Sequence, residues 1–307
     1  MRVDKAGRGA VSGPMEQWPP TTTIPTTGTP MAKPLQIDGI PIHIEGPAQP
    51  DDSVVMIHGW PDTHRLWDTT VAALKDRHRC VRFTLPGFDN TRPRDPRSVQ
   101  QLCELFARIV EAACPGQRVT LLVHDWGAVF GYQFALRRPD LVARVIGVDV
   151  GDANSPQHLK SLSTKAKLGI AGYQWWLMLA WRLGAILPSL GDGMTRRMAR
   201  ALRCPAPQAL IGSGMCYPYD MAWLGSHGGL KRLAPVALTQ PMLFIYGTRK
   251  PFMFHSQAWA DALAARPGCQ VVALRTGHWV MDNDPAGFID AVRAWLDATP
   301  SRVEPTP

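Results

Sequence analysis

The sequence lacks several features that mark metal-binding, secreted or membrane-spanning proteins. Its six cysteines never stand within four residues of one another, which excludes the spacing of zinc and redox motifs. The basic residues near the N-terminus are not followed by an apolar run, so a secretory signal is not predicted. We therefore expect free, small thiols in a reducing, cytoplasmic compartment.

Acidic residues are scarce in one part of the chain. Only 19% of the 307 residues are charged and 45% are hydrophobic, so the chain can bury a large core. Residues 153–235 contain ten lysines and arginines but only Asp192 and Asp220, a surplus that equals the whole net charge of +8. Because the charge belongs to one segment, a nucleic-acid partner is not expected. A solvated face is the simplest interpretation, and attraction of an anionic substrate or a membrane surface is the alternative.

One stretch, Leu168 to Leu190, carries a single charge at Arg182 and is long enough to span a bilayer. Three glycines interrupt it, however, and Pro188 lies near its end. We predict a buried or cavity-lining helix instead of a transmembrane span.

From residue 35 onward, the sequence alternates between strand and helix patterns. Asp38-Gly39, between two alternating runs, predicts a hairpin. Strand patterns follow at 54–57, 80–85, 119–123, 145–150, 242–246 and 270–274, and helical ones at 98–113, 128–137, 259–265 and 285–296. This order is typical of an α/β fold with a mostly parallel, doubly wound sheet.

The alternation is interrupted once, by the Trp-rich and basic residues 153–235. We predict a core formed by residues 35–152 and 236–298, with 153–235 as an inserted helical cap. Residues 1–34 are rich in Thr, Pro and Gly and are predicted to be a disordered leader, and 299–307 a polar tail.

Tight turns and titratable side chains follow several of the predicted strands. The sequences are His58-Gly59-Trp60-Pro61, His124-Asp125-Trp126-Gly127 and Gly277-His278-Trp279. Ligands bind beyond the carboxyl ends of the strands in open α/β sheets, so we expect these groups to meet. Asp125 stands at an abrupt strand-to-helix turn that would project it alone into the cleft. The alternative for Asp125 is a helix cap.

These motifs, in this order, resemble the α/β-hydrolase fold, and within it the branch with an aspartate nucleophile, the epoxide hydrolases and haloalkane dehalogenases. The resemblance implies that Asp125 attacks an sp³ carbon to form an alkyl ester. His278 would activate the water that hydrolyses this ester, and the backbone N–H groups of Trp60 and Trp126 would form the oxyanion hole. Because the chain supplies all these groups, no metal or other cofactor is expected.

The acid of the triad is expected at Asp149, at the end of the strand that follows the nucleophile helix, with Asp152 as its competitor. In the family's other arrangement the acid follows the strand over 242–246. The residues there, Tyr246 to Pro251, include no acid, so the sequence departs from that pattern.

Three of the five tyrosines lie in the predicted cap. Epoxide hydrolases carry two tyrosine donors there, and the resemblance implies Tyr173 and Tyr217 as the donors to the epoxide oxygen. Tyr219, Trp175 and Trp176 are expected to bind the substrate, with plain packing of the lid as the alternative.

We therefore predict an epoxide hydrolase that converts a small lipophilic epoxide into a vicinal diol. A haloalkane dehalogenase is the first alternative, because Trp175 or Trp176 would be able to add an indole donor for a halide. A binding protein without catalytic activity is the second. The substrate is the expected partner, and a homodimer is left open.

Overall fold

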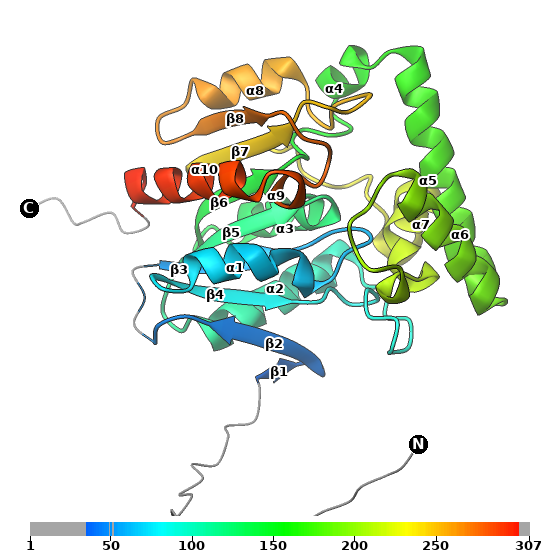
Figure 1. The fold of residues 1–307 in the computed structure, drawn as a ribbon, viewed down its shortest axis with the longest axis horizontal. Helices are drawn as coiled ribbons and strands as arrows, with labels where there is room; N and C mark the ends of the chain where they lie inside the picture. Colours follow the sequence, from blue (N-terminus) through cyan, green and yellow to red (C-terminus); the bar gives the residue numbers. More distant parts are fainter. Residues whose placement is uncertain (1–34, 49, 51, 301–307) are drawn as a thin grey trace, which may run out of the picture. The chain divides into compact units, whose positions relative to one another are not determined.

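The computed structural model describes residues 35–48, 50 and 52–300. The predicted leader and most of the predicted tail lie outside these residues. The described chain contains an eight-stranded sheet in the order β1-β2-β4-β3-β5-β6-β7-β8, with helices on both of its faces (Figure 1). The strands are β1 (Gln36–Ile37), β2 (Ile40–Glu45), β3 (Asp52–Ile57), β4 (His78–Phe83), β5 (Val119–His124), β6 (Val142–Val148), β7 (Met242–Gly247) and β8 (Gln270–Leu274).

Strands β1 and β2 form the predicted hairpin, in which Asp38 and Gly39 both take positive φ angles. Strand β2 pairs antiparallel with β4, and all pairs from β4 to β8 are parallel. Every residue of β3, β5 and β6 is buried, as expected for strands covered on both faces. These findings confirm the predicted α/β fold.

Alternate strand residues face two separate core layers, because successive side chains of a strand point to opposite faces. Val55 and Ile57 of β3 belong to one layer, and Val54 and Met56 to the other. Helices α2 (Val99–Ala113), α3 (Trp126–Arg137) and α8 (Gln257–Ala264) contribute to the first layer, and α1 (Asp68–Leu74), α9 (Val280–Asn283) and α10 (Pro285–Ala298) to the second.

The segment 153–235 enters between β6 and β7 and lies beyond the carboxyl ends of the parallel strands (Figure 1). It contains α4 (Pro156–Ser161), α5 (Thr164–Gly184), α6 (Pro188–Ala201) and α7 (Tyr217–Leu224). The segment also contains three short 3-10 turns, η2 (Gln208–Leu210), η3 (Ser213–Cys216) and η4 (Ser226–Gly228). A further 3-10 turn, η1 (His64–Trp67), precedes α1 in the core. Among the described helices, none has both the length and the apolar character needed to cross a membrane.

Candidate active site

Asp125 occupies a sharp turn between β5, which ends at His124, and α3, which begins at Trp126. Its backbone angles are φ 52° and ψ −123°, in the positive-φ region that non-glycine residues rarely adopt. Within the described chain, its carboxylate makes no capping hydrogen bond to α3. Instead, the backbone N–H of Trp60 donates to Asp125 Oδ2 at 2.7 Å. Asp125 therefore stands at the N-cap position of α3, but the alternative that its side chain serves to cap the helix is wrong.

Two glycines allow the backbones around this turn to approach closely. A Cβ atom on Gly59 would lie 2.5 Å from Asp125 Oδ2 and equally close to the Trp126 nitrogen. A Cβ atom on Gly127 would lie 2.4 Å from the carbonyl oxygen of His58. Any side chain at these positions would therefore displace either the carboxylate or the two predicted oxyanion donors.

Two buried histidines, to which the sequence analysis gave no role, support the turn. His58 Nε2 accepts from the Leu85 N–H at 2.9 Å, so its Nδ1–H donates to the Gly59 carbonyl at 3.0 Å. The ring of His124 lies 4.5 Å from that of His278. Burial lowers the pKa of both His58 and His124 to about 3, so both are neutral at physiological pH.

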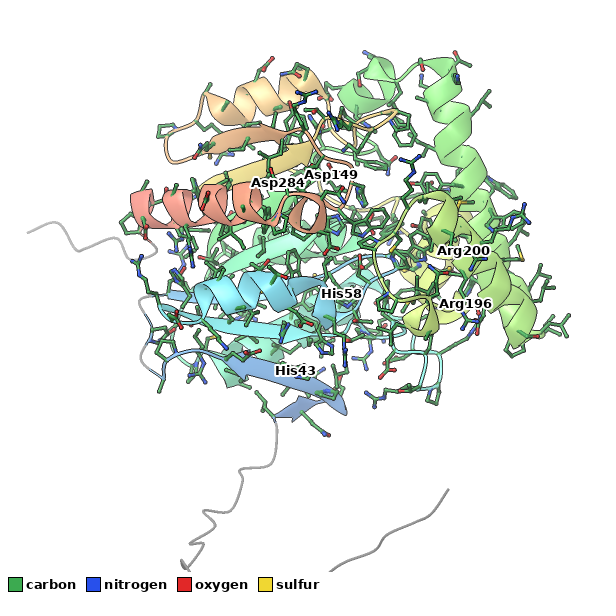
Figure 2. All side chains as sticks on the ribbon, in the orientation of Figure 1. His43, His58, Asp149, Arg196, Arg200 and Asp284 are labelled. Atoms are coloured by element: carbon green, nitrogen blue, oxygen red, sulfur yellow. The ribbon has the colours of Figure 1, made fainter. Side chains whose placement is uncertain are left out.

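Asp125, His278 and Asp149 form one line of contacts. His278 Nε2 lies 3.6 Å from Asp125 Oδ1, and His278 Nδ1 is hydrogen-bonded to Asp149 Oδ2. Asp149 is fully buried at the end of β6, and Figure 2 shows it on the side of the sheet that faces the inserted segment. The structure therefore brings together the three residues that the sequence predicted as a triad.

The competing acid, Asp152, has a different set of partners. It accepts hydrogen bonds from the Ser256 N–H at 2.6 Å and from the Ser155 hydroxyl at 2.5 Å. These bonds join the start of α4 to the start of α8, so Asp152 acts as a structural link and Asp149 as the partner of His278.

The charges at the site stabilise one another. Burial alone would lower the pKa of His278, but the carboxylates of Asp149 and Asp125 raise it to about 9. Burial alone would raise the pKa of Asp125, but hydrogen bonding to His278 holds it below its ordinary value. At neutral pH the resting site is therefore an imidazolium between two carboxylates.

Lys250, which the sequence analysis gave no role, is a further member of this cluster. It lies after β7, and its Nζ is 2.5 Å from Asp149 Oδ1, to which the Gly247 N–H also donates at 3.0 Å. The Lys250 side chain is only 6% exposed, and its ammonium lies 5.5 Å from the centre of the Phe254 ring. A buried cation thus stands in the loop where the other arrangement of the family has its acid.

Two tyrosines of the inserted segment lie near Asp125. Tyr173 of α5 and Tyr219 of α7 have ring centres 6.2 Å apart, and the Tyr219 ring meets the Trp126 ring edge to face at 5.2 Å. Burial raises the pKa of both phenols, and the negative charge of Asp125 raises it further. Both tyrosines therefore stay protonated and can donate a proton toward the site.

Tyr217 does not lie at this site, which corrects the prediction that it is a donor. Its ring packs against Phe88 and Trp181, with ring centres 6.0 and 6.1 Å away. Residues two apart on a helix point about 200° away from each other, so only one of Tyr217 and Tyr219 can face Asp125. Tyr219 takes the position that was expected of Tyr217.

Trp175 and Trp176 also point elsewhere, which corrects their prediction as substrate contacts. The side chain of Trp175 is 45% exposed and lies against Trp223, with ring centres 5.5 Å apart. Trp176 Nε1 donates to the Met194 carbonyl of α6 at 2.9 Å. Trp175 lies on a different face of α5 from Tyr173, and the Trp176 indole N–H is already bonded to the Met194 carbonyl, so neither indole N–H is directed to Asp125.

Comparison with known protein families agrees with the fold. Residues 54–291 match the model of the alpha/beta hydrolase family, and this range covers more than half of the chain. The chain belongs to the alpha/beta hydrolase family. The family resemblance inferred from the sequence motifs is therefore confirmed.

Individual relatives differ in how much of this chain they match. The probable oxidoreductase EphD of Mycobacterium tuberculosis is 34% identical over 126 residues, which cover 40% of this chain and 21% of EphD. The chain thus spans only about a fifth of the length of that relative. A cis-3-alkyl-4-alkyloxetan-2-one decarboxylase of Xanthomonas campestris is 25% identical over 282 residues, covering 83% of this chain and 91% of the relative.

Solved structures of alpha/beta hydrolases share the fold. An epoxide hydrolase of Bacillus megaterium, in complex with an inhibitor, superposes with a TM-score of 0.65. Its sequence is 20% identical, and the match covers 86% of this chain and 99% of that one. At 20% identity this likeness shows the fold alone. The chemistry is inferred from the residues around Asp125.

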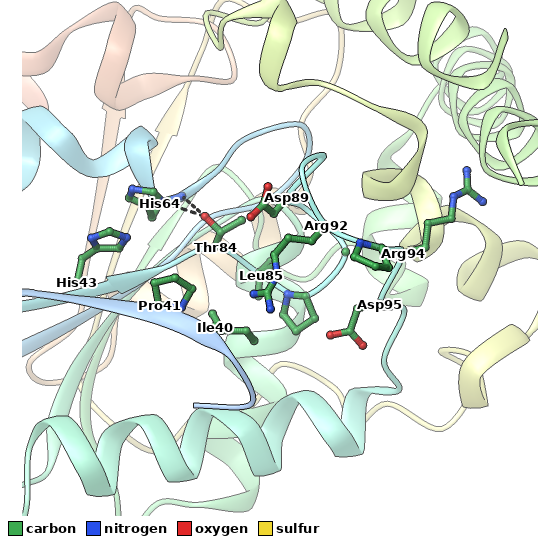
Figure 3. A pocket seen from close by; sticks show the side chains of 13 residues that line it. Ile40, Pro41, His43, His64, Thr84, Leu85, Asp89, Arg92, Arg94 and Asp95 are labelled. Carbon is green, nitrogen blue, oxygen red and sulfur yellow. Dashed lines mark hydrogen bonds between the residues drawn. The ribbon is translucent and has the colours of Figure 1, made fainter. Parts of the chain in front are cut away.

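A separate cavity of about 310 Å³ opens beside β2 in this alpha/beta hydrolase (Figure 3). His43 and His64 stack at one of its walls, with ring centres 4.1 Å apart, and His64 is hydrogen-bonded to Thr84. Its walls also carry Arg92 and Asp95. None of the residues of the cluster around Asp125 lines this cavity, so it is distinct from the candidate active site.

Proposed function

We propose that this alpha/beta hydrolase is an epoxide hydrolase, which opens a lipophilic epoxide to a vicinal diol through an ester of Asp125. The observation that carries the proposal is a carboxylate at the nucleophile turn with two protonated tyrosines near it, of which Tyr219 is buried and Tyr173 partly buried. A carboxylate forms an ester by attack on a strained carbon–oxygen bond, and a phenol can protonate the oxygen that leaves. The chain thus supplies both the nucleophile and the proton donor that opening of the epoxide ring requires.

In the first step, one oxygen of Asp125 attacks an epoxide carbon and the bond from that carbon to the ring oxygen breaks. Tyr173 or Tyr219 donates its phenolic proton to this oxygen, which becomes a hydroxyl group. The resulting phenolate recovers a proton from the His278 imidazolium. The step leaves a neutral ester on Asp125, a neutral His278 and no net change in charge.

The second step depends on the change in charge at Asp125. The Asp125 carboxylate helps to raise the pKa of His278 to about 9, and this contribution disappears when the carboxylate becomes an ester. His278 can then take a proton from a water molecule that attacks the ester carbonyl. The Trp60 N–H already contacts Asp125 Oδ2, where it would stabilise the oxyanion. Collapse releases the diol and restores the carboxylate and the imidazolium.

The dehalogenase alternative loses support because the Trp175 ring lies against Trp223 and the Trp176 N–H donates to the Met194 carbonyl. A second candidate comes from the Xanthomonas relative, whose name describes decarboxylation of an oxetan-2-one. An oxetan-2-one is a strained four-membered ring that contains oxygen, so the same carboxylate would be able to open it. The tyrosine pair favours the epoxide, since an alkoxide formed by ring opening needs a proton donor.

Intact-protein mass spectrometry of the His278→Gln variant tests the proposal, because removal of the base should stall the reaction at the ester. Parallel samples receive an aryl epoxide, a primary bromoalkane and a dialkyl oxetan-2-one. We expect an adduct with the epoxide, mapped by peptide analysis to Asp125. His278→Gln combined with Asp125→Asn is the matched control and should stay unmodified.

The other outcomes have definite meanings. An adduct with the bromoalkane alone would identify a dehalogenase, and one with the oxetanone alone would favour a reaction like that of the Xanthomonas relative. An epoxide adduct mapped to a residue other than Asp125 would overturn the mechanism. The absence of any adduct, together with no diol formed by the unmodified chain, would reject the epoxide hydrolase assignment.

A further inference from the structure

Helix α5 carries a row of apolar side chains on the face turned away from the core. Leu168, Trp175 and Leu179 recur at intervals of seven and four residues, and Ile186 continues the row in the turn after the helix. These intervals place Leu168, Trp175 and Leu179 on one face of α5, and Ile186 follows just beyond the end of the helix. Leu168 is 69% exposed and Ile186 79% exposed, so the two ends of this row are open to solvent in the described chain.

Further exposed apolar side chains adjoin this row, at the turn after α5 and on α7. Leu183 and Leu187 add exposed apolar side chains near the turn between α5 and α6. Trp223 of α7 lies against Trp175, and both indoles are partly exposed. We name the six residues of the row and the turn the α5 stripe: Leu168, Trp175, Leu179, Leu183, Ile186 and Leu187. Scattered exposed leucines are ordinary, but several large exposed apolar side chains along one helix face and the turn that follows mark an interaction surface.

The segment that carries the α5 stripe is strongly positive. Its two acids are already engaged: Asp220 is paired with Arg182, and Asp192 accepts two hydrogen bonds from Ser213. The same segment carries exposed lysines and arginines, namely Lys160, Lys165, Lys167, Arg197, Arg200 and Arg203. Figure 2 shows Arg200 on α6, the helix packed against α5.

Charge and apolar character together select the partner of this surface. A second copy of the chain would bring one segment of charge +8 against another, which disfavours a dimer through this face. An anionic lipid bilayer provides negative headgroups for the lysines and arginines and an apolar depth for the leucines and the tryptophan. Indole rings prefer the boundary between these two zones.

We propose that the α5 stripe docks on the surface of an anionic lipid bilayer, with α5 lying along the membrane plane. The segment lies beyond the carboxyl ends of the parallel strands, so the bilayer would face the part of the molecule that adjoins Asp125 (Figure 1). If the proposed function holds, a lipophilic substrate dissolved in the membrane lies next to the enzyme. The docking itself does not depend on that reaction.

Co-sedimentation of the full chain with lipid vesicles tests the docking. One set of vesicles contains phosphatidylcholine alone, and the other contains phosphatidylcholine and phosphatidylglycerol. We expect sedimentation with the second set, weaker sedimentation with the first, and a decrease in binding as salt screens the charges. Equal binding to both sets would overturn the charge argument.

Variants separate the apolar and the electrostatic contributions. Ile186→Ser with Leu187→Ser removes two exposed apolar side chains and should weaken vesicle binding at least about tenfold. Lys165→Gln with Lys167→Gln should weaken it about fivefold for each charge. The matched controls are Leu159→Ser, an exposed leucine outside the stripe, and Arg293→Gln on α10, and both should bind as the unmodified chain does.

Two results would overturn the proposal. The first is that no vesicle retains the unmodified chain, or that the Ile186/Leu187 variant binds as well as the controls. The second is that sedimentation velocity finds a dimer that only the Ile186/Leu187 variant dissociates, which would make the stripe an interface between copies. Because the readout is binding, a failure here leaves the assignment of the reaction untouched.

Discussion

The ammonium group of Lys250 lies 2.5 Å from one carboxylate oxygen of Asp149, and the imidazole of His278 is bonded to the other. A single buried carboxylate therefore stabilises two cations. Each cation disfavours the protonated form of the other, because both lie in a region from which water is excluded. Lys250 thus limits how strongly Asp149 holds the proton of His278.

Replacing Lys250 with methionine should therefore raise the pKa of His278 above its present value of about 9. The pKa of His278 in the ester state should rise for the same reason, so hydrolysis of the ester at pH values below that pKa should slow about tenfold for each unit of the increase. The measurement is the decay of the alkyl-enzyme in single-turnover experiments across a range of pH. The rate profile should move toward higher pH.

Two control variants belong to this experiment. Lys250→Arg keeps the charge and should restore much of the profile, and Arg249→Met removes an exposed neighbouring charge and should leave the profile unchanged. If Lys250→Met loses activity equally at every pH, Lys250 has only a structural role.

The two tyrosines at Asp125 should be separable from the third by mutation. Tyr219→Phe removes a proton donor while it keeps the ring that packs on Trp126, so formation of the ester from an epoxide should slow about 100-fold. Tyr173→Phe should have a similar effect, and the double variant a larger one. Rapid-quench measurement of ester formation provides the rate.

Tyr217→Phe is the matched control for these variants. The Tyr217 ring packs against Phe88 and Trp181. Removal of its hydroxyl should therefore change the rate of ester formation less than about threefold. A larger loss with Tyr217→Phe than with Tyr219→Phe would contradict the placement of the donors described here.

The contrast between these tyrosines shows where sequence analysis was sufficient and where it was not. Asp125 and His278 could be predicted because each follows a strand of the parallel sheet, and the residues of each turn adjoin it in the sequence. Tyr217 and Tyr219 differ only in helical phase, and α7 begins at Tyr217 itself, so no earlier turn of the helix defines that phase. The sequence therefore predicted the kind of donor but not the right residue.

Helix α5 posed a related problem. It is apolar nearly all round, so its sequence does not show which face is buried. Trp175 and Trp176 were for this reason expected in the site, although the structure turns them away from it. The pairing of Lys250 with Asp149 was not predicted because it depends on the adjacency of β6 and β7, which are separated by the whole inserted segment.

Asp62 provides a test of the electrostatics beside the site. It is buried and accepts a hydrogen bond from Trp279 Nε1 at 2.9 Å, and burial raises its pKa to about 7. An acid with a raised pKa in the folded state destabilises the fold when it ionises. This cost is absent below the ordinary pKa of 3.8 and is complete above about pH 7.

Asp62→Asn should therefore stabilise the protein at alkaline pH while the amide oxygen still accepts from Trp279. We expect the midpoint of thermal unfolding to rise by at least about 2 °C at pH 8 and to change little at pH 4. Calorimetry at both pH values measures the difference, with exposed Asp76→Asn as the control. An equal change at both values would show that the effect of Asp62 is not one of charge.

Gly59 should tolerate no side chain, for a steric reason. Its missing Cβ would fall 2.5 Å from both Asp125 Oδ2 and the Trp126 nitrogen, and these belong to the nucleophile and to an oxyanion donor. Gly59→Ala must therefore shift the turn, and removal of such donors typically slows catalysis 10²–10³-fold, so we expect a loss of about that size in turnover. Gly169→Ala, at a position with no atom within 4 Å of the added Cβ, is the control and should keep full activity. Circular dichroism and turnover should be measured together: a folded Gly59→Ala variant with normal turnover would mean that the Trp60 and Trp126 amides do not stabilise the reacting carboxylate.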